Sequence, residues 1–335
     1  MTKPFDKETY YALTLDPLHV GTGGFRLGRV DNTIVREPGT NVPKIPGSSI
    51  AGVARACTAM AIQSDDHAKK RYSGTRTDAK GVTVSASCAG KGADDGEGHC
   101  GQYNCEVCSA YGFSKKSSES FQGLAQFYDA RIIFFPVQSS KGPVWITSPA
   151  LLREYDSVPP VANILLIEGE EELQTTLVAT GEKINIGWLY LPNKGQTAPL
   201  NIAALPVVVQ AELKPIIDRL VLVPDSLFSQ VVNDNLEVRT SVAIDPATGA
   251  AVDGALFTYE AIPRATVMLF DVVYNDPAFF AIAGQEIKKD VGTAADTAWV
   301  KENVEKGLAY FEYAGLGGMN TRGMGRFKIL NLGGA

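Results

Sequence analysis

The chain has 335 residues, of which 45% are hydrophobic and 20% are charged, so it can bury the core of one large domain or of two ordinary ones. It contains no apolar run of about 18 residues and no apolar leader, which excludes a membrane span and a signal peptide and predicts a cytoplasmic location. The formal net charge of -6 argues against a free-standing, general nucleic-acid binder, but it allows a subunit that presents one basic face within a larger assembly.

The first two predicted elements are a strand and a helix. Tyr10–Leu15 is rich in aromatic and β-branched residues, which is typical of a strand. Ser48 or Ser49 is a good N-cap for a helix that runs to about Gln63. Apolar residues recur along this helix at helical spacing and should face the core: Ile50, Val53, Ala54, Cys57 and Met60.

Residues 64–122 have a different composition, because they are rich in Gly, Ser, Lys and Asp and show little hydrophobic periodicity. The segment is too long for an ordinary loop, so we expect an insertion. It contains four of the five cysteines, including a C-x2-C pair that lets two thiolates bind one ion from a single turn. The segment therefore predicts a structural zinc site with the preferred ligands Cys88, Cys100, Cys105 and Cys108.

Two alternatives to this ligand set stay open. His99 could replace Cys88 or Cys100, although adjacent residues seldom both face one ion. The cysteines could instead be free thiols in a loose insertion. Zinc is the favoured interpretation, because a long and poorly hydrophobic segment gains stability from a bound metal.

Beyond residue 122 the chain alternates predicted strands with one clear helix. Leu124–Val137 and Thr266–Tyr274 are predicted strands, and two further strand-like runs lie within Val242–Ile262 around the turn signal Asp245–Gly249. Thr297–Tyr313 has the pattern of an amphipathic helix. Strands interleaved with two main helices predict an α+β fold, in which an antiparallel sheet carries its helices on one face.

A locally basic segment lies between Arg26 and Arg55, with five cations and two acids in an otherwise acidic chain. Such a segment indicates an anionic partner, most plausibly a polyanion backbone. Asp31 lies among these cations, where its carboxylate could meet that backbone. The alternative is that Asp31 forms an inert surface ion pair with Arg29 or Arg36.

A second candidate for phosphate binding is Gly315–Arg326, which contains five glycines and two arginines. Glycines allow backbone N–H groups to approach a phosphate closely, and arginines add charge-assisted hydrogen bonds. The alternative is a tight connection between a helix and a strand.

Five stretches together resemble the backbone subunit of the type III-B CRISPR effectors, which belongs to the RAMP superfamily. No single stretch is highly specific, but their common order is, and the resemblance runs from about Thr9 to about Ile329. The stretches are VDNTIVREPG (30–39), PKIPGSSIAGVAR (43–55), DARIIFFPVQSSKGPVWITSP (129–149), VAIDPATGAAVDGALFTYEAIP (242–263) and GLGGMNTRGMGRF (315–327).

The resemblance implies an RRM-like (ferredoxin-like) β-α-β-β-α-β sheet within a single domain over residues 1–335. Large insertions would interrupt this domain at about 64–122, which carries the zinc site, and at about 160–262, which holds thumb-like and lid-like elements. In the family, a thumb-like hairpin wedges between bases of the guide–target duplex. Its tip cannot be placed from this sequence.

The resemblance also implies a function. The family's subunits polymerise head-to-tail along a guide RNA, assemble with other type III subunits, and cleave bound target RNA at regular intervals. The aspartate of the family's VD-x-x-I-x-R-E pattern is needed for this cleavage, together with a divalent metal such as Mg²⁺ or Mn²⁺, and here it is Asp31. A non-catalytic scaffold that binds guide RNA is the alternative. A guide-processing endonuclease is disfavoured, because the chain has only three histidines.

RNA contacts are expected from the basic segment, the start of the first helix and the glycine-rich loop. The family's lysine in this helix is replaced by Ala51, so that phosphate contact is either missing or supplied by Lys44 or Arg55. These two cations are expected to share one face with the loop. The full set of expected RNA-binding residues is His19, Arg36, Lys44, Ser48, Ser49, Arg55, Gly317, Gly318, Asn320, Thr321, Arg322, Gly323 and Arg326.

Overall fold

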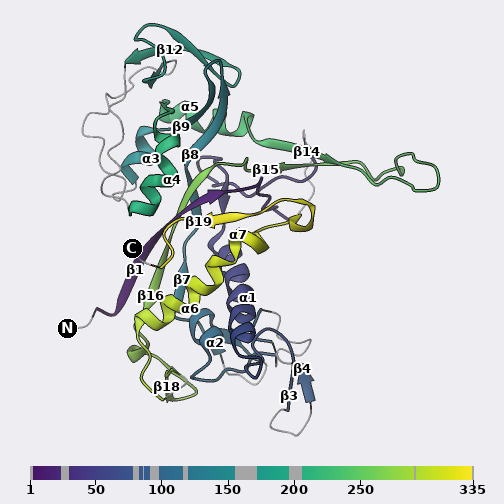
Figure 1. Cartoon of the computed structure of the whole chain (residues 1–335), viewed down its shortest axis with the longest axis vertical. Helices are drawn as coiled ribbons and strands as arrows, with labels where there is room; N and C mark the ends of the chain where they lie inside the picture. Colours follow the sequence, from purple (N-terminus) through teal and green to yellow (C-terminus); the bar gives the residue numbers. More distant parts are fainter. Residues whose placement is uncertain are drawn as a thin grey trace.

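A computed structural model describes residues 3–23, 30–77, 83–85, 87–90, 98–115, 120–154, 172–195, 206–289 and 292–333. At its centre lies an antiparallel sheet of four main strands (Figure 1). In spatial order they are β19 (Phe327–Ile329), β1 (Phe5–Thr14), β16 (Val267–Asn275) and β8 (Ala130–Ser139). Two short strands extend it, since β2 (Lys44–Ile45) pairs with β8 and β7 (Ala125–Phe127) pairs with β16.

Two helices pack together on one face of this sheet, α1 (Gly47–Asp65) and α6 (Thr297–Ala309). They lie close together at Gly307, where an added Cβ would lie 2.2 Å from the Thr58 hydroxyl oxygen. In chain order the elements β1, α1, β8, β16, α6 and β19 alternate as β-α-β-β-α-β. The predicted α+β fold is therefore confirmed.

The opposite face of the sheet is also covered, so the expectation of helices on one face is wrong. Successive residues of a strand point to opposite faces, and in β1 both Tyr10 and Tyr11 are buried, in separate hydrophobic clusters. The cluster around Tyr11 includes Val209, Leu213 and Ile216 of α4 (Val207–Ile217).

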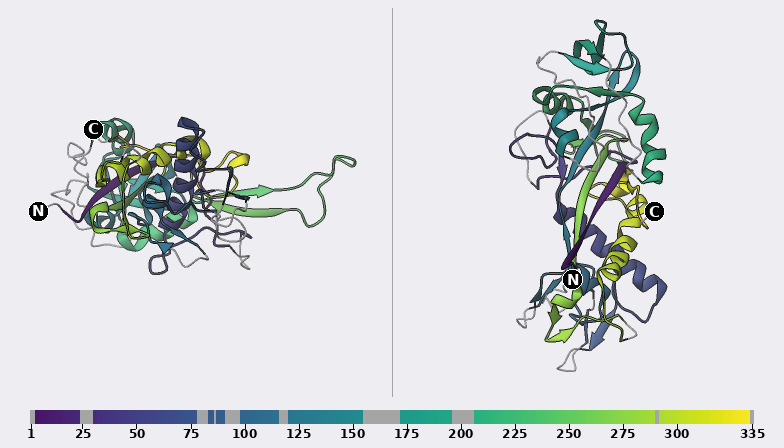
Figure 2. Two further views of the ribbon diagram at one scale, coloured as in Figure 1. Left: turned by 90° about the horizontal axis from the view of Figure 1, so that it is seen from below. Right: turned by 90° about the vertical axis from the view of Figure 1, so that its left-hand side faces the viewer.

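The sheet differs from a simple RRM-like sheet because it continues beyond β8 into a closed ring of six strands. From β8 the order is β9 (Gly142–Thr147), β13 (Leu220–Leu222), β10 (Leu173–Thr175), β12 (Leu189–Gly195) and β11 (Lys183–Ile186). The ring closes where Ile186 pairs with Ser139, and the pairs β9–β13 and β10–β12 are parallel. Closure satisfies backbone groups that an open edge would leave unpaired. Figures 1 and 2 show this barrel at one end of the long molecule.

The first helix begins earlier than predicted. Its N-cap is Pro46 rather than Ser48 or Ser49, and the Gly47 N–H donates to the Asp129 carboxylate at 2.8 Å. Gly47 fits because a Cβ there would lie 2.3 Å from the Phe127 carbonyl oxygen. The expected core residues Ile50, Ala54 and Cys57 are buried, but Met60 is 38% exposed. Thr297–Tyr313 is helical as predicted, with α6 followed by α7 (Phe311–Ala314).

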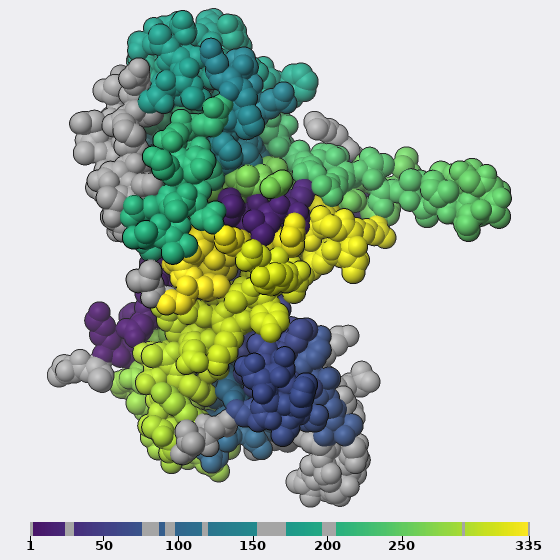
Figure 3. All heavy atoms as spheres, in the orientation of Figure 1, coloured from purple at the N-terminus to yellow at the C-terminus, as the bar shows by residue number. Residues whose placement is uncertain are grey.

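A hairpin of β14 (Glu237–Ser241) and β15 (Phe257–Ala261) projects from the body, as Figure 1, the left view of Figure 2 and Figure 3 show. The predicted turn is present, because the Gly249 N–H donates to the Asp245 carbonyl at 2.8 Å. None of residues 242–256 is buried.

The remaining elements are short, and no helix among the described residues is long and apolar enough to cross a membrane. They are α2 (Glu106–Tyr111), α3 (Pro149–Glu154), α5 (Asp225–Asp234), the strand pairs β3 (Thr75–Thr77) with β4 (Thr83–Ser85), β5 (Phe113–Ser114) with β6 (Ser120–Phe121) and β17 (Ala281–Ile282) with β18 (Gln285–Glu286), and the 3₁₀ turns η2 (Pro277–Phe279) and η3 (Asn320–Arg322).

Candidate functional site

Asp31 lies at the base of the projecting hairpin, where its segment runs beside β15. The Asn32 N–H donates to the Thr258 carbonyl and the Glu260 N–H donates to the Asn32 carbonyl, each at 3.0 Å. Asn32 pairs with Tyr259 as a parallel bridge. The backbone of the hairpin thus holds the segment that carries Asp31.

The Asp31 carboxylate is exposed and is held by one residue. Its Oδ2 accepts from the Thr258 N–H at 2.8 Å and from the Thr258 hydroxyl at 2.9 Å. The backbone N–H of Thr258 lowers the pKa of Asp31, so the carboxylate is ionised at neutral pH. Asp31 does not form the ion pair with Arg36 that the sequence allowed, because Arg36 is paired with Glu260. The other possible partner, Arg29, lies outside the described residues, as does Arg26.

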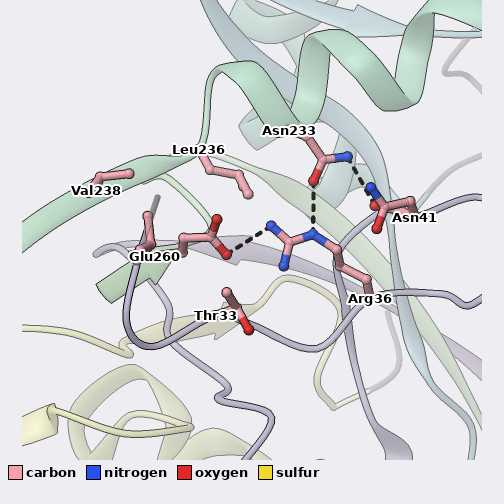
Figure 4. Close-up of a pocket in the computed structure, with 8 residues that line it drawn as sticks. Thr33, Arg36, Asn41, Asn233, Leu236, Val238 and Glu260 are labelled. Carbon is pink, nitrogen blue, oxygen red and sulfur yellow. Dashed lines mark hydrogen bonds and ion pairs between the residues drawn. The ribbon is translucent and has the colours of Figure 1, made fainter. Parts of the chain in front are cut away.

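Arg36 forms the polar wall of a pocket beside this segment (Figure 4). Its guanidinium donates to Glu260 at 2.8 Å, to the Asn233 side chain at 2.9 Å and to the Ile34 carbonyl at 2.9 Å. Both members of the Arg36–Glu260 ion pair are largely buried. Arg36 therefore ties the Asp31 segment to the hairpin and to α5. The pocket measures about 340 Å³ and is lined by Val30, Thr33, Arg36, Asn41, Asn233, Leu236, Val238 and Glu260.

His19 connects the hairpin to the glycine-rich loop. Its Nδ1 lies 2.6 Å from the Glu260 carbonyl oxygen, and its own carbonyl accepts from the Gly318 N–H at 2.8 Å. At Gly317 the φ is +85°, and a Cβ would lie 2.4 Å from the His19 carbonyl oxygen, so only glycine fits there. His19, Gly317 and Gly318 thus lie together close to the hairpin base.

The tip of the glycine-rich loop is exposed. Its 3₁₀ turn contains Asn320, Thr321 and Arg322, and it lies between left-handed residues at Met319 and Gly323. The Asn320 side chain donates to the Ala314 carbonyl at 3.0 Å, which closes the loop onto α7. The Arg322 guanidinium reaches the Ser241 hydroxyl of the hairpin at 3.1 Å.

Arg326 differs from Arg322, because it is already paired with a carboxylate. Its guanidinium makes two hydrogen bonds to Asp16, at 2.5 and 3.2 Å. These hydrogen bonds lower the pKa of Asp16. Such bidentate pairing reduces the charge that Arg326 can offer to a phosphate.

Lys44 and Arg55 have protein partners of their own. Lys44 lies 2.7 Å from both Glu37 and Asp129, and the hydrogen bond to Asp129 raises the pKa of Lys44. Arg55 donates to the Cys88 carbonyl at 2.7 Å and lies 3.0 Å from Nδ1 of His99. A common face of these two cations with the glycine-rich loop stays a prediction. Ser48 and Ser49 lie in the first turn of α1, and Ser48 is exposed.

The four predicted cysteine ligands come together, with all four sulfur atoms within 4.8 Å of one another. The sulfurs of Cys100 and Cys108 are 3.7 Å apart, as are those of Cys88 and Cys108, and those of Cys88 and Cys105 are 4.0 Å apart. Four thiolates at 2.3 Å from one tetrahedral zinc ion would lie about 3.8 Å apart. The cluster therefore fits a tetrahedral metal ion.

The local sequence explains how the cluster forms. Cys105 is the N-cap of α2, and its sulfur accepts from the Cys108 N–H at 3.4 Å, which brings the C-x2-C pair to one side of a single turn. Hydrogen bonds from the other three cysteines, Cys100 first, lower the pKa of Cys88. His99 is buried beside the cluster but is not one of the four ligand positions.

Thr258 and Glu260 are the site residues that sequence reasoning missed. Both lie on β15, and they contact residues more than 220 positions earlier in the chain. A strand pattern over 257–261 indicates local structure, but it does not indicate which distant segment the strand will contact.

Comparisons with known proteins place this arrangement in a family. The model of the RAMP superfamily matches residues 11–328. The CRISPR system Cmr endoribonuclease Cmr4 of Pyrococcus furiosus is 26% identical over 328 residues, which cover 94% of this chain and 92% of that protein. In structure, the chain resembles a type III-B Cmr-beta complex subunit in the apo state (TM-score 0.61, 15% identity, 96% of both chains). It also resembles Pyrococcus furiosus Cmr4 (Cas7) (TM-score 0.54, 19% identity, 97% of this chain and 98% of that one). Because the family model spans almost the whole length, the chain belongs to the RAMP superfamily.

Proposed function

We propose that this protein is the repeated backbone subunit of a type III-B CRISPR ribonucleoprotein and cleaves bound target RNA beside Asp31. A relative named as an endoribonuclease matches nearly the full length of the chain. The observation that carries the proposal is the Asp31 carboxylate, which is exposed, ionised and held at the base of a projecting hairpin. A non-catalytic scaffold that binds guide RNA is the second candidate, because the basic segment would serve it equally.

The partners in this proposal are guide RNA, target RNA, further copies of the chain arranged head-to-tail, and other type III subunits. Two similar solved structures support this set. One is described as a type III-B Cmr-beta complex bound to cognate target RNA, and it covers 98% of this chain with a TM-score of 0.59. The other is described as oligomeric Cmr4 from Pyrococcus furiosus, with a TM-score of 0.52.

The glycine-rich loop is the proposed phosphate contact for guide RNA. Gly317, Gly318 and Gly323 would let backbone N–H groups approach the RNA, with Asn320 and Thr321 between them. Arg322 supplies the charge there, since its guanidinium meets a neutral hydroxyl rather than a carboxylate. His19 and Arg36 would act indirectly, by holding the loop and the Asp31 segment against the hairpin.

In the proposed cleavage, the hairpin distorts the duplex and splays one nucleotide, whose 2′-OH attacks the adjacent phosphorus in line. As the P–O2′ bond forms the P–O5′ bond breaks, so the products are a 2′,3′-cyclic phosphate and a 5′-hydroxyl that takes up the proton lost by the 2′-OH. Asp31 would offer one carboxylate oxygen to Mg²⁺ or Mn²⁺, which would neutralise phosphate charge when bound. Among the described residues, the one group of three or more metal-ligand side chains is the cysteine cluster. A single aspartate is nevertheless sufficient for an ion that keeps several waters and phosphate oxygens as ligands.

We further propose that the cysteine cluster holds a structural Zn²⁺, since the sulfur spacing fits and four ligands leave no open position. We also propose a single domain, on the basis of the order of its elements. The β-α-β-β-α-β part would be its RRM-like core, with insertions at about 64–122 and 160–262. The structure describes these insertions outside residues 78–82, 86, 91–97, 116–119, 155–171 and 196–205.

The decisive experiment is target cleavage by the reconstituted complex with Asp31→Ala. We expect the cleavage rate to fall by about 10²- to 10⁴-fold, because the group that acts at the scissile phosphate is lost. Guide binding should change less than about twofold, because removing an acid weakens no phosphate contact. Asp65→Ala, which removes an exposed acid at the end of α1, is the control and should cut normally. Cleavage by Asp31→Ala at the wild-type rate would exclude Asp31 as the catalytic residue, and an inactive wild-type complex would favour the scaffold.

A further inference from the structure

Asp31 and Thr258 form a reciprocal set of three hydrogen bonds across 227 positions of the chain. The Asp31 N–H donates to the Thr258 hydroxyl oxygen at 3.1 Å. The Thr258 hydroxyl and N–H both donate to Oδ2 of Asp31, at 2.9 and 2.8 Å. One residue of the hairpin therefore fixes both the backbone and the side chain of Asp31.

The two carboxylate oxygens of Asp31 differ in their hydrogen bonding. Both donors go to Oδ2, and among the described residues no hydrogen bond reaches Oδ1. An exposed aspartate without such contacts would sample several rotamers, and ordering it during the reaction would cost conformational entropy. Thr258 lowers that cost in advance by fixing Oδ2, which leaves Oδ1 of this exposed side chain available to a ligand.

The backbone of this region is held independently of the Thr258 side chain. Main-chain hydrogen bonds join Asn32 to Thr258 and to Glu260, and Arg36 forms its ion pair with Glu260. Loss of the Thr258 hydroxyl should therefore loosen the Asp31 carboxylate, which keeps only the Thr258 N–H as a donor, while the segment stays against β15.

We infer that Thr258 is the positioning residue for Asp31. The ability of the Asp31 carboxylate to act in cleavage then depends on the base of the projecting hairpin, where Thr258 lies. The inference rests on the proposed function, in which Asp31 acts at the scissile phosphate. It assigns to the hairpin a second task besides contact with the duplex, because β15 also orients the cleaving group.

The test compares three variants in the complete complex with guide RNA, under single-turnover conditions. Thr258→Val removes the hydroxyl with little change in shape, and Thr258→Ser keeps it. Thr240→Val is the matched control, because Thr240 is exposed and lies directly opposite Thr258 on β14. We expect Thr258→Val to slow cleavage about tenfold or more, which corresponds to one charge-assisted hydrogen bond. Thr258→Ser should recover most of the rate, and Thr240→Val should cut normally.

Two further measurements separate this inference from the proposed function. Target affinity by gel shift should stay unchanged in all three variants, and hydrogen exchange at the Asp31 amide should become faster in Thr258→Val alone. Wild-type cleavage by Thr258→Val, with Asp31→Ala inactive, overturns the inference and leaves the proposed function intact. Equal losses in Thr258→Ser and Thr258→Val, or a loss of target affinity, also overturn it. If Asp31→Ala cuts normally, the proposed function fails, while the exchange measurement still reports whether Thr258 anchors Asp31.

Discussion

At the scale of single residues, the surroundings of each charged side chain decide what it can bind. Lys44 and Arg36 carry the charge expected of RNA contacts, but each is held by carboxylates of this same chain. Arg322 and Arg326 come from one loop and differ in the same way, because Arg326 is paired with Asp16, whereas Arg322 has no acidic partner in the part of the chain that the structure describes. Charge in the sequence is therefore not the same as charge available to a phosphate.

This difference predicts unequal effects of two substitutions on guide binding. Arg322→Ala should weaken binding about equally for all guide sequences and reduce the slope of log affinity against log salt by about 0.7 to 1. Arg326→Ala should have a smaller effect, since Asp16 already compensates its charge. Binding measured over a salt series checks both. Lys306→Ala, on the exposed side of α6, is the control, and equal slopes for the two arginine variants would contradict the argument.

At the scale of elements, the cysteine cluster organises a region that has little hydrophobic sequence. Cys105 both caps α2 and joins the cluster, so one residue links local helix formation to the ligand set. Around it, Glu106 binds Lys69 at 2.7 Å and Arg71 at 3.2 Å. Two of the three cations at positions 69–71 therefore stabilise the insertion itself rather than present free charge.

Cys105→Ser is expected to remove most of the bound metal and to expose residues 64–122 to protease. Wild-type protein should contain about one zinc per chain, because the four thiolates form one tetrahedral set. The central sheet should survive, since its strands are joined by their own backbone ladders and the hydrophobic cluster on its second face contains none of the cysteine ligands. Metal analysis together with limited proteolysis provides the measurement.

The matched control is Cys57→Ala, which removes the one cysteine outside the cluster. Cys57 is buried in α1, so this variant loses some stability but should keep its zinc. Metal content near zero in the wild-type protein, prepared without a chelator, would refute the zinc assignment.

At the scale of the whole molecule, a packed body carries one projecting hairpin. The central sheet is buried on both faces and continues into the closed barrel, whereas the hairpin extends away from the body (Figure 2). The base of the hairpin is packed, with Tyr259 and Ala261 in a small cluster with Met324. The packed base can therefore hold Asp31 in a defined position, while the exposed tip can contact a partner.

Replacing Ala243–Ala255 with an Asn-Gly turn should leave the fold intact. None of residues 242–256 is buried, so we expect the free energy of unfolding to change by less than about 0.5 kcal/mol. Guide binding should persist, and target cleavage should fall about tenfold or more, because the splayed geometry that supports in-line attack is lost. Thermal unfolding tests the prediction on stability, and single-turnover cleavage tests the prediction on activity. Full cleavage by the shortened protein would show that the tip is not required.

Features that depend on local pattern and covalent spacing could be predicted from the residues alone. Helical periodicity predicted α6, the turn signal at Asp245–Gly249 predicted a reversal that the hairpin contains, and the C-x2-C pair with two further cysteines predicted the ligand set. These features could be predicted because neighbouring residues already contain most of the information. The ordered motifs of the RAMP superfamily were equally visible, and the family comparison confirmed them.

The contacts between distant segments became known only from the folded chain. Ring closure through Ser139 and Ile186, the cover of α4 on the second face, and the contact between Asp31 and Thr258 all join residues that lie far apart in the chain. Arg55 shows the same limit, because its hydrogen bond to the Cys88 carbonyl oxygen could not be predicted from the sequence. The physical reason is that burial and hydrogen-bond satisfaction are properties of the whole packed chain, so a residue's type restricts its possible partners and the fold selects among them.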